Sequence, residues 1–270
     1  LVFPESFKAY CLNAYEAYKQ GALDPNRFVV YLKDEPISER KEREGRCRLI
    51  YCSDLVTNVV FRMVFGSLLL RFNTMGESSS LCIGMNQYSW DMETLYQQCK
   101  RVSTDFIAGD FKNFDKRVHP DFLKANFHFL MELAGDLATP QMKALFIKHQ
   151  SQAPFQVLDL LIQPKATHYS GCFFTTPFNC FLVEAYMRYA FKRLCPGLSF
   201  TDHIGLQMMG DDHIMSVGQA VQDRFNMVTI AETLEEIGQV YTSDDKDAAL
   251  SSGFRKFTDI TFLGSTPRLV

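Results

Sequence analysis

Apolar residues recur along this chain in two kinds of pattern, and each predicts a different kind of element. Helical spacing predicts helices in six segments: 7–19, 54–71, 91–100, 122–134, 141–150 and 219–237. Alternating or continuous apolar runs predict strands at 28–33, in the segment that ends near position 110, at 155–163, on both sides of Gly210-Asp211 and up to 265. Helices and strands mixed in this order predict an α+β fold, an antiparallel sheet with helices on one face.

The bulk composition narrows the class of protein. The chain is 47% hydrophobic and 22% charged, which is typical of a soluble globular protein. The richest apolar run, 55–72, is interrupted by Asn58, Arg62 and Gly66, so it predicts a buried helix and not a membrane span. The net charge of −3 excludes an overall basic coat, so a polyanion would need a local basic patch. The eight cysteines lack zinc-type spacing, which indicates free thiols.

The stretch LQMMGDDHIMSVG (206–218) sets two acids side by side between apolar runs. Gly followed by Asp at this place predicts a type II′ hairpin with Asp211 and Asp212 at its tip. Adjacent carboxylates repel each other. A bound cation is one explanation for this acid pair, and a solvated turn is the other. Magnesium takes carboxylate and phosphate oxygens, and Asp110, at the end of its own strand, is the candidate third ligand. The neighbouring His213 is expected to be a packing residue.

Two pairs of acids with the same five-residue spacing compete for a functional role. Asp105 precedes the strand-like residues Phe106 and Ile107, whereas Asp110 precedes the break KNFDK, which contains Asp115. Asp110 therefore lies at the carboxyl end of the strand. We choose Asp110 and Asp115 as the functional pair.

Three further segments carry candidate chemistry. SGCFFTTPFN (170–179) offers a Ser-Gly loop and, four residues apart, Thr175 and Asn179. An amide and a carboxylate together can bind a ribose hydroxyl. Taken alone, however, the segment favours an ordinary helix capped by Thr176. Five basic residues within nine positions could bind phosphates, or could form a solvated mixed-charge loop: Arg40, Lys41, Arg43, Arg46 and Arg48. Lys246 is either a proton donor to a leaving phosphate or a surface lysine.

Taken together and in order, these segments resemble the RNA-dependent RNA polymerases of positive-strand RNA viruses, most closely the picornavirus-like group. KDE with GRCRLI (33–50) resembles the fingers motif for the incoming triphosphate, and DFKNFD (110–115) resembles the first palm motif. SGCFFTTPFN resembles the second palm motif and GDD the third. Lys246 and FLGS (262–265) occupy the places of the two motifs that follow.

The resemblance implies a right-hand polymerase palm plus partial fingers. Residues 67–149 and 169–270 would form the palm, residues 1–66 and 150–168 the fingers, and a thumb would be absent. The implied reaction is RNA-templated RNA synthesis, by nucleotidyl transfer from ribonucleoside triphosphates to a 3′-hydroxyl with two Mg²⁺ ions, for which Mn²⁺ can substitute.

The resemblance also assigns roles to individual residues. Asp110 and Asp211 would be metal ligands with Asp212 beside them, and Lys246 the general acid. The phosphate-contacting positions would be Lys33, Lys41 and Arg48, and the ribose-selecting positions would be Asp115, Ser170, Thr175 and Asn179. Gly171 would be a further substrate-binding position. Met209 departs from the family, which usually has Tyr there, and FLGS lacks the basic residue often found in the last motif.

The resemblance implies partners and a location as well. The partners would be an RNA template, a primer or product strand and other viral replication proteins, at membrane-associated complexes in the cytoplasm of the infected cell. We interpret the chain as a core fragment of a viral polyprotein that is not expected to be active alone. A reverse transcriptase is an alternative, against which Asp115 argues, and a non-catalytic palm-like RNA-binding fragment is another.

Overall fold

The chain forms two compact units, which we describe separately. The computed structural model describes residues 3–23, 26–74, 79–164, 167–245 and 248–268. Unit 1 contains Leu1–Leu69 and Phe127–Thr175, and unit 2 contains Leu70–Asn126 and Thr176–Val270. Residues 127–149, which the sequence assigns to the palm, therefore cluster with unit 1. The division into palm and fingers stays a prediction.

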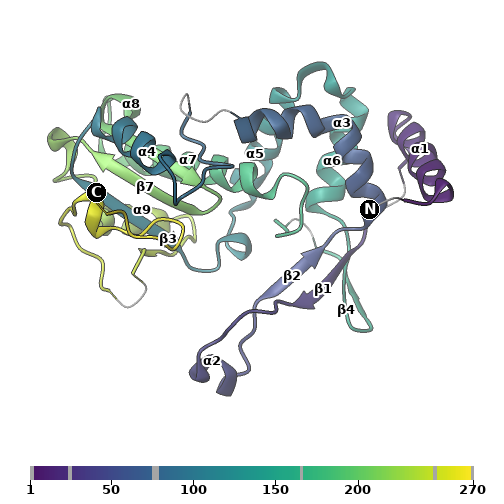
Figure 1. Ribbon diagram of the computed structural model, residues 1–270, viewed down its shortest axis with the longest axis horizontal. Helices are drawn as coiled ribbons and strands as arrows, with labels where there is room; N and C mark the ends of the chain where they lie inside the picture. The colour runs from purple at the N-terminus through teal and green to yellow at the C-terminus, as the bar shows by residue number, and fades with distance from the viewer. Residues whose placement is uncertain (1–2, 24–25, 75–78, 165–166, 246–247, 269–270) are drawn as a thin grey trace. The chain divides into compact units, whose positions relative to one another are not determined.

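Helices and short strands are interspersed along the chain (Figure 1). The α-helices are α1 (Glu5–Lys19), α2 (Glu39–Arg43), α3 (Leu55–Thr74), α4 (Asp91–Lys100), α5 (Pro120–Leu133), α6 (Pro140–Ser151), α7 (Thr175–Leu194), α8 (Phe200–His203) and α9 (Met227–Glu235). The strands are β1 (Phe28–Leu32), β2 (Leu49–Cys52), β3 (Phe106–Phe111), β4 (Phe155–Val157), β5 (Leu160–Ile162), β6 (Ile204–Met209), β7 (Asp212–Val217) and β8 (Tyr241–Ser243). The first five predicted helices are confirmed to within a few residues. The mixed α+β class is confirmed.

Two of the predicted strands are wrong. The segment 155–163 is a hairpin, β4 and β5, and Leu158 between them has a φ of 54°. Leucine is not a typical residue for this left-handed conformation, so the sequence gives no turn signal there. The segment that ends at 265 is a tight turn closed by a single bridge between Phe262 and Ser265.

Two predicted helix starts are also wrong. Of the helix expected at 219–237, only the segment of α9 forms an α-helix. It starts there because the Asn226 side chain and Thr229 form a capping box. Helix α7 begins at Thr175, so Thr176 lies inside the helix and is not its cap. The Thr175 hydroxyl donates to the Cys172 carbonyl at 2.7 Å, which fixes this first turn.

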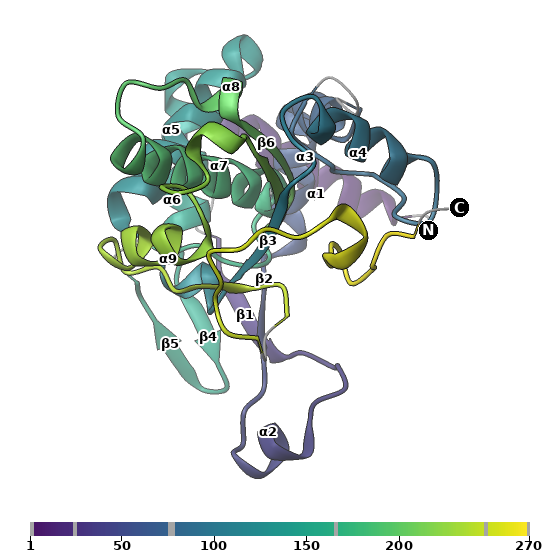
Figure 2. The same ribbon diagram turned by 90° about the vertical axis from the view of Figure 1, so that its left-hand side faces the viewer.

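Unit 2 is built on a four-stranded antiparallel sheet in the order β6-β7-β3-β8. Helix α4 contacts one face, where Leu95 packs with Phe106 and Ala108 of β3. Helix α7 lies on the other face, where the rings of Phe111 and Tyr186 are 6.0 Å apart (Figure 2). The sheet is therefore covered on both faces and not on one, which agrees with the almost complete burial of β3.

Unit 1 contains a second four-stranded sheet, in the order β2-β1-β4-β5, in which only the β1–β4 pairing is parallel. Phe28 of β1 stacks on Tyr169 with ring centres 4.1 Å apart. In the helical part, Phe61 of α3 and Phe146 of α6 are 4.7 Å apart. Aromatic packing thus joins the sheet to the loop before α7 and joins the helices to each other.

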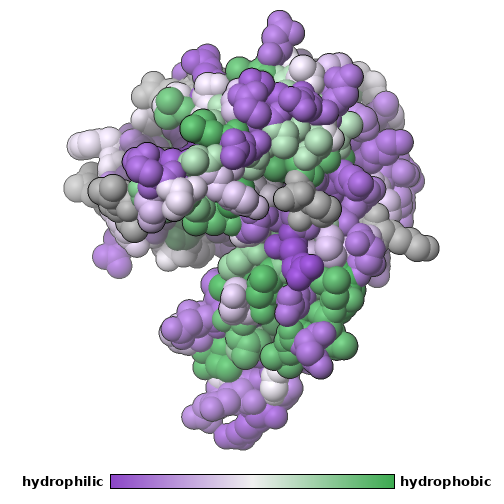
Figure 3. Space-filling model, turned by 90° about the vertical axis from the view of Figure 1, so that its right-hand side faces the viewer, coloured by the Kyte–Doolittle hydropathy of each residue, from purple (hydrophilic) through white to green (hydrophobic). Residues whose placement is uncertain are grey.

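The outer part of the unit 1 sheet exposes large apolar side chains. Apolar atoms gather on this part of the surface (Figure 3). The exposed residues are Tyr31, Leu32, Leu158, Leu160, Leu161 and Ile162. An apolar face of this kind differs from the polar outer face that is usual for a solvated sheet.

Helix α3 is the one helix in the described residues that is long and apolar enough to cross a membrane, judged by length and composition alone. Of its most apolar stretch, 39% is buried within the protein. Val60, Phe61 and Phe65 of α3 are fully buried in unit 1, as predicted for a core helix.

Candidate active site

The acid pair Asp211-Asp212 lies at the β6–β7 turn of unit 2. Met209 and Asp212 form the last pair of the ladder, so Gly210 and Asp211 make a two-residue turn. Gly210 has a φ of +71°, whereas Asp211 is not among the residues with positive φ. A positive φ at the first turn residue only is the type II′ pattern, so the predicted turn is confirmed.

Asp110 reaches the same end of the sheet from the neighbouring strand. The register of β3 and β7 ends at the pair Gly109 and His213. Strand β3 then continues through Asp110 to Phe111, and β7 begins at Asp212, so Asp110 and Asp212 lie at the same end of the sheet. Carboxylates at one end of a sheet are candidate ligands for a divalent cation. The prediction that Asp110 lies near the carboxyl end of its strand is confirmed.

Asp105, the competing acid, lies at the opposite end of β3 and has a structural role. Its carboxylate forms a 3.0 Å ion pair with Lys256 and accepts from the side-chain amide of Gln222 at 3.1 Å. The hydrogen bonds from Gln222 and Lys256 hold the pKa of Asp105 below its ordinary value. This supports the choice of Asp110 over Asp105.

His213 is a buried packing residue, as predicted. It is 1% exposed, and its two ring nitrogens lie 3.0 Å from the Asp211 carbonyl and 3.0 Å from the Tyr241 hydroxyl. Burial lowers the pKa of His213 to about 4, so the imidazole is neutral at neutral pH. It therefore adds no positive charge next to the acids.

The acids suit a hard divalent cation by their chemistry. Magnesium is usually held by one or two carboxylates and completes its shell with water and substrate phosphates. Asp110, Asp211 and Asp212 supply carboxylate oxygens at one end of the sheet. Within the part of the chain that the structure describes, no group of three or more His, Cys, Asp or Glu side chains is arranged to hold a metal. The donor set fits an ion that takes further ligands from its substrate.

Two of the predicted ribose-selecting residues, Asp115 and Asn179, lie in unit 2. Asp115 is in the short 3₁₀ turn after β3, which Asn113 precedes in a left-handed conformation with a φ of 56°. Asparagine tolerates this conformation better than most residues. Asn179 lies in α7 and is only 6% exposed.

The Ser170-Gly171 loop lies against strand β2 in unit 1. The Tyr51 N–H donates to the Ser170 hydroxyl oxygen at 3.3 Å. A Cβ atom at Gly171 would lie 1.7 Å from the Tyr51 carbonyl oxygen, so only glycine fits. Two of the predicted substrate-binding residues thus also fix the position of their own loop.

The basic segment of unit 1 is neutralised in large part by its own glutamates. The ion pairs are Lys33–Glu35 at 2.8 Å, Arg48–Glu35 at 3.3 Å, Arg43–Glu39 at 3.0 Å, Arg40–Glu44 at 3.8 Å and Arg46–Glu44 at 3.0 Å. The Lys33 N–H also donates to the Arg48 carbonyl, so the strands and Glu35 bring these two predicted phosphate-binding residues together. The hydrogen bond from Lys33 and the charge of Arg48 hold the pKa of Glu35 below its ordinary value. Lys41 is exposed on α2.

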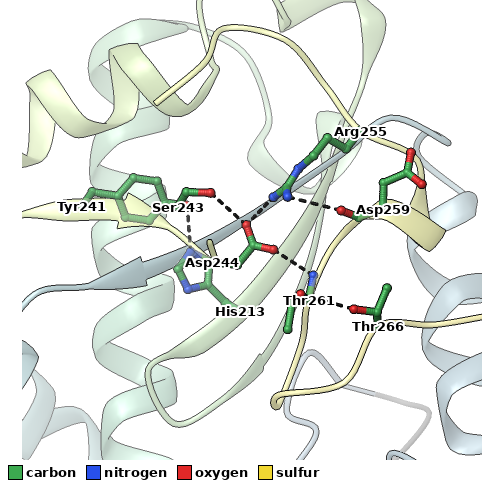
Figure 4. A network of polar contacts seen from close by, with 8 residues as sticks. All are labelled: His213, Tyr241, Ser243, Asp244, Arg255, Asp259, Thr261 and Thr266. Carbon is green, nitrogen blue, oxygen red and sulfur yellow. Dashed lines mark hydrogen bonds and ion pairs between the residues drawn. The ribbon is translucent and has the colours of Figure 1, made fainter. Parts of the chain in front are cut away.

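Lys246 lies outside the described residues, so its predicted role stays a prediction. The chain just before it is fixed by Asp244, whose carboxylate binds Arg255 and accepts from the Thr261 N–H at 2.8 Å and the Ser243 hydroxyl at 3.0 Å (Figure 4). Burial by itself raises the pKa of Asp244. The contacts with Arg255 and Thr261 outweigh that effect, and the pKa lies below its ordinary value.

Three residues that organise the candidate site are not identified by the sequence analysis. Glu35 forms ion pairs with Lys33 and Arg48, two predicted phosphate-binding residues. Its place in the KDE stretch, two residues after Lys33, is a sequence signal that could have identified it. Cys180 accepts a hydrogen bond from the Gly210 N–H at 3.1 Å, and Tyr241 contacts His213. These last two look like ordinary core residues in the sequence.

Comparison with known proteins identifies the family. The profile of the viral RNA-dependent RNA polymerases matches residues 8–269. The replicase polyproteins of Drosophila C virus, Cricket paralysis virus and Acute bee paralysis virus are 27%, 25% and 24% identical over 261, 262 and 245 residues, and the matches cover 90%, 90% and 84% of this chain. The chain spans only 15%, 15% and 13% of the length of these polyproteins. Because the profile covers almost the entire sequence, the chain belongs to the viral RNA-dependent RNA polymerase family.

Proposed function

We propose that this chain carries out RNA-templated RNA synthesis in viral genome replication, as part of a replicase. The family profile over residues 8–269, combined with the placement of Asp110 and the Asp211-Asp212 turn at one end of the sheet, supports this function. The similar proteins are replicase polyproteins, which supports a role beside other viral replication proteins. Its partners would be an RNA template and a primer or product strand, at membrane-associated complexes in the host cytoplasm.

Unit 2 would be the palm and the sheet of unit 1 part of the fingers. The antiparallel sheet of unit 2 carries Asp110 and the Asp211-Asp212 turn, as expected for a polymerase palm. Unit 1 carries the basic segment, in which Lys33 and Arg48 lie together on neighbouring strands. This arrangement supports a triphosphate site formed by basic residues and a metal site formed by acids.

The residues divide the chemistry between them. Asp110 and Asp211, with Asp212 beside them, would hold divalent magnesium or manganese, which when bound lowers the pKa of the 3′-hydroxyl and neutralises charge on the triphosphate. Lys33, Lys41 and Arg48 would contact the phosphates, because ammonium and guanidinium groups bind phosphate oxygens. The remaining proposed roles are ribose recognition by Asp115, Ser170, Thr175 and Asn179, substrate binding by the loop at Gly171, and protonation of the leaving pyrophosphate by Lys246.

Primer extension with the full-length protein that carries this chain tests the proposal. The wild-type protein should incorporate ribonucleotides in preference to deoxyribonucleotides on an RNA template. Asp211→Asn should reduce the rate by about 10²-fold or more, because it removes a charge that acts on the reacting groups. Asp202→Asn, a change to an exposed acid on α8, is the matched control and should keep wild-type activity. A preference for deoxyribonucleotides, or full activity in Asp211→Asn, would contradict the proposal.

A further inference from the structure

Two buried side chains hold the backbone on either side of Asp211. The Gly210 N–H donates to the Cys180 sulfur at 3.1 Å, and the Asp211 carbonyl oxygen lies 3.0 Å from Nδ1 of His213. Cys180 is fully buried and His213 is 1% exposed. Backbone groups at the tip of a hairpin usually face water. Here the chain is fixed by protein groups both where it enters the turn and where it leaves Asp211.

The second contact continues to strand β8 through a defined tautomer. A carbonyl oxygen can only accept a hydrogen bond, so Nδ1 of His213 must carry the ring proton. Nε2 is then the acceptor, and the Tyr241 hydroxyl donates to it at 3.0 Å (Figure 4). A Cβ atom at Gly109 would lie 2.0 Å from the Tyr241 hydroxyl oxygen, so a glycine directly before Asp110 makes room for this ring. The contact therefore depends on residues from three adjacent strands.

We infer that Cys180, His213 and Tyr241, the Asp211 clamp, are positioning residues that fix the Asp211 backbone and so aim its carboxylate at the metal site. The inference rests on the proposed function, because that function makes Asp211 a metal ligand. None of the three side chains needs to touch metal or substrate. Each acts through the backbone of the turn.

The clamp matters because the turn carries repelling charges. Asp211 and Asp212 are adjacent in the chain, and Asp110 lies at the same end of the sheet, so their like charges repel one another. Backbone contacts hold the turn in place against this repulsion. A small displacement of a ligand is costly, since groups that orient metal ligands typically change metal affinity or activity 10-fold to 100-fold when they are removed.

The clamp also joins the turn to the helix that carries Asn179. Cys180 follows Asn179 directly in α7, and its sulfur is bound to the turn. Any shift of this part of α7 therefore acts on the turn as well. The proposed ribose reader and the proposed metal ligand share one support.

The test uses two variants that each remove a single clamp contact, with a matched control for each. Cys180→Ala removes the sulfur acceptor, and Cys195→Ala removes an equally buried thiol just beyond the end of the same helix. Tyr241→Phe removes the hydroxyl donor, and Tyr186→Phe removes a fully buried hydroxyl that is bound to Gln239 and not to His213. Mn²⁺ alone is the probe, and its binding to the full-length protein is followed by electron paramagnetic resonance without nucleotide or RNA.

We expect Cys180→Ala and Tyr241→Phe to raise the dissociation constant for Mn²⁺, and to lower kcat for ribonucleotide incorporation, by about 10-fold each. The KM for nucleotide should change little, and excess metal should restore part of the activity. Cys195→Ala and Tyr186→Phe should keep wild-type metal affinity even where they lower the melting temperature. Cys180→Ser, which keeps an acceptor, should recover most of the loss. If Cys180→Ala does not fold, Tyr241→Phe with its control tests the clamp.

The two measurements, Mn²⁺ binding and ribonucleotide incorporation, separate this inference from the proposed function. If Cys180→Ala and Tyr241→Phe bind Mn²⁺ as their controls do, or if the wild-type protein binds none, the clamp is overturned. If their affinities fall as expected but the wild-type protein incorporates no ribonucleotide, the clamp stands and the proposed function fails.

Discussion

A single methyl group at Gly171 tests whether the predicted substrate loop is held by strand β2. A Cβ atom there would lie 1.7 Å from the Tyr51 carbonyl oxygen and 2.9 Å from the carbonyl carbon. Both are backbone atoms, so no side-chain rotation relieves the contact. An ordinary carbon to oxygen contact is about 3.3 Å, so Gly171→Ala must move the loop or the strand by about 1.5 Å.

The expected loss of stability has two parts. Forcing an extra methyl group into a packed site typically costs about 1–3 kcal/mol. The displacement also breaks the hydrogen bond from the Tyr51 N–H to Ser170, which contributes about 1 kcal/mol. Gly171→Ala should therefore lower the free energy of unfolding by about 2–4 kcal/mol, a large share of the roughly 5–15 kcal/mol that stabilises a typical domain.

Urea denaturation followed by circular dichroism measures this change, and Gly66→Ala is the matched control. Gly66 lies inside α3 of the same unit, where a Cβ atom would meet nothing closer than 3.7 Å. The same added methyl group should stabilise that helix by up to about 1 kcal/mol, because alanine favours the helical conformation. The two substitutions should thus have effects of opposite sign. A Gly171→Ala protein as stable as the wild type would refute the reasoning.

Three further predictions concern charged residues. Asp244→Asn should lower the free energy of unfolding by about 1–2 kcal/mol at pH 7, since it weakens a largely buried ion pair. The folded-state pKa of Asp244 is lowered, so its contribution is fully present above the unfolded-state pKa of about 4 and is lost as the pH falls through the folded-state pKa. Urea titrations should therefore show a smaller difference between variant and wild type at pH 3 than at pH 7. Glu35→Gln should raise the KM for nucleotides with little change in kcat, because the carboxylate no longer holds Lys33 and Arg48 together. Steady-state primer extension measures KM and kcat. A change in kcat alone would contradict the role of Glu35 in nucleotide binding. Asp115→Ala should reduce the preference for ribonucleotides over deoxyribonucleotides by about 10-fold, the effect of one lost hydrogen bond, and equal losses for both sugars would exclude a ribose-reading role.

The sequence predicts those features of the candidate site that depend on residues close together in the chain. The β6–β7 turn follows from Gly210-Asp211 between two apolar runs, because glycine takes the positive φ that a two-residue turn needs. The place of Asp110 follows from the apolar residues before it and the break after it. Both features depend on neighbours within a few residues, which is the range over which sequence patterns are informative.

Features that depend on distant partners do not follow from the sequence. Gly210 and Cys180, which form a hydrogen bond, lie 30 positions apart in the sequence. His213 and Tyr241 lie 28 positions apart. Neither pair forms a pattern that differs from ordinary core residues. Asn226 is a different case, because its capping box involves only neighbouring residues. The amphipathic pattern continues on both sides of Asn226, so it predicted a helix start that is too early.

The unit 2 sheet carries acids at both of its ends, and the contacts around them link the fold to the proposed reaction. Asp105 is paired with Lys256, and Asp244 with Arg255, so these two acids serve the fold. At the β6–β7 turn the adjacent ring, His213, is neutral and binds the backbone instead of a carboxylate. The contact made by His213 thus holds the turn through its backbone. Under the proposed function we expect divalent cations and a triphosphate to bind at this turn, and the Mn²⁺ titration measures the first of these steps directly.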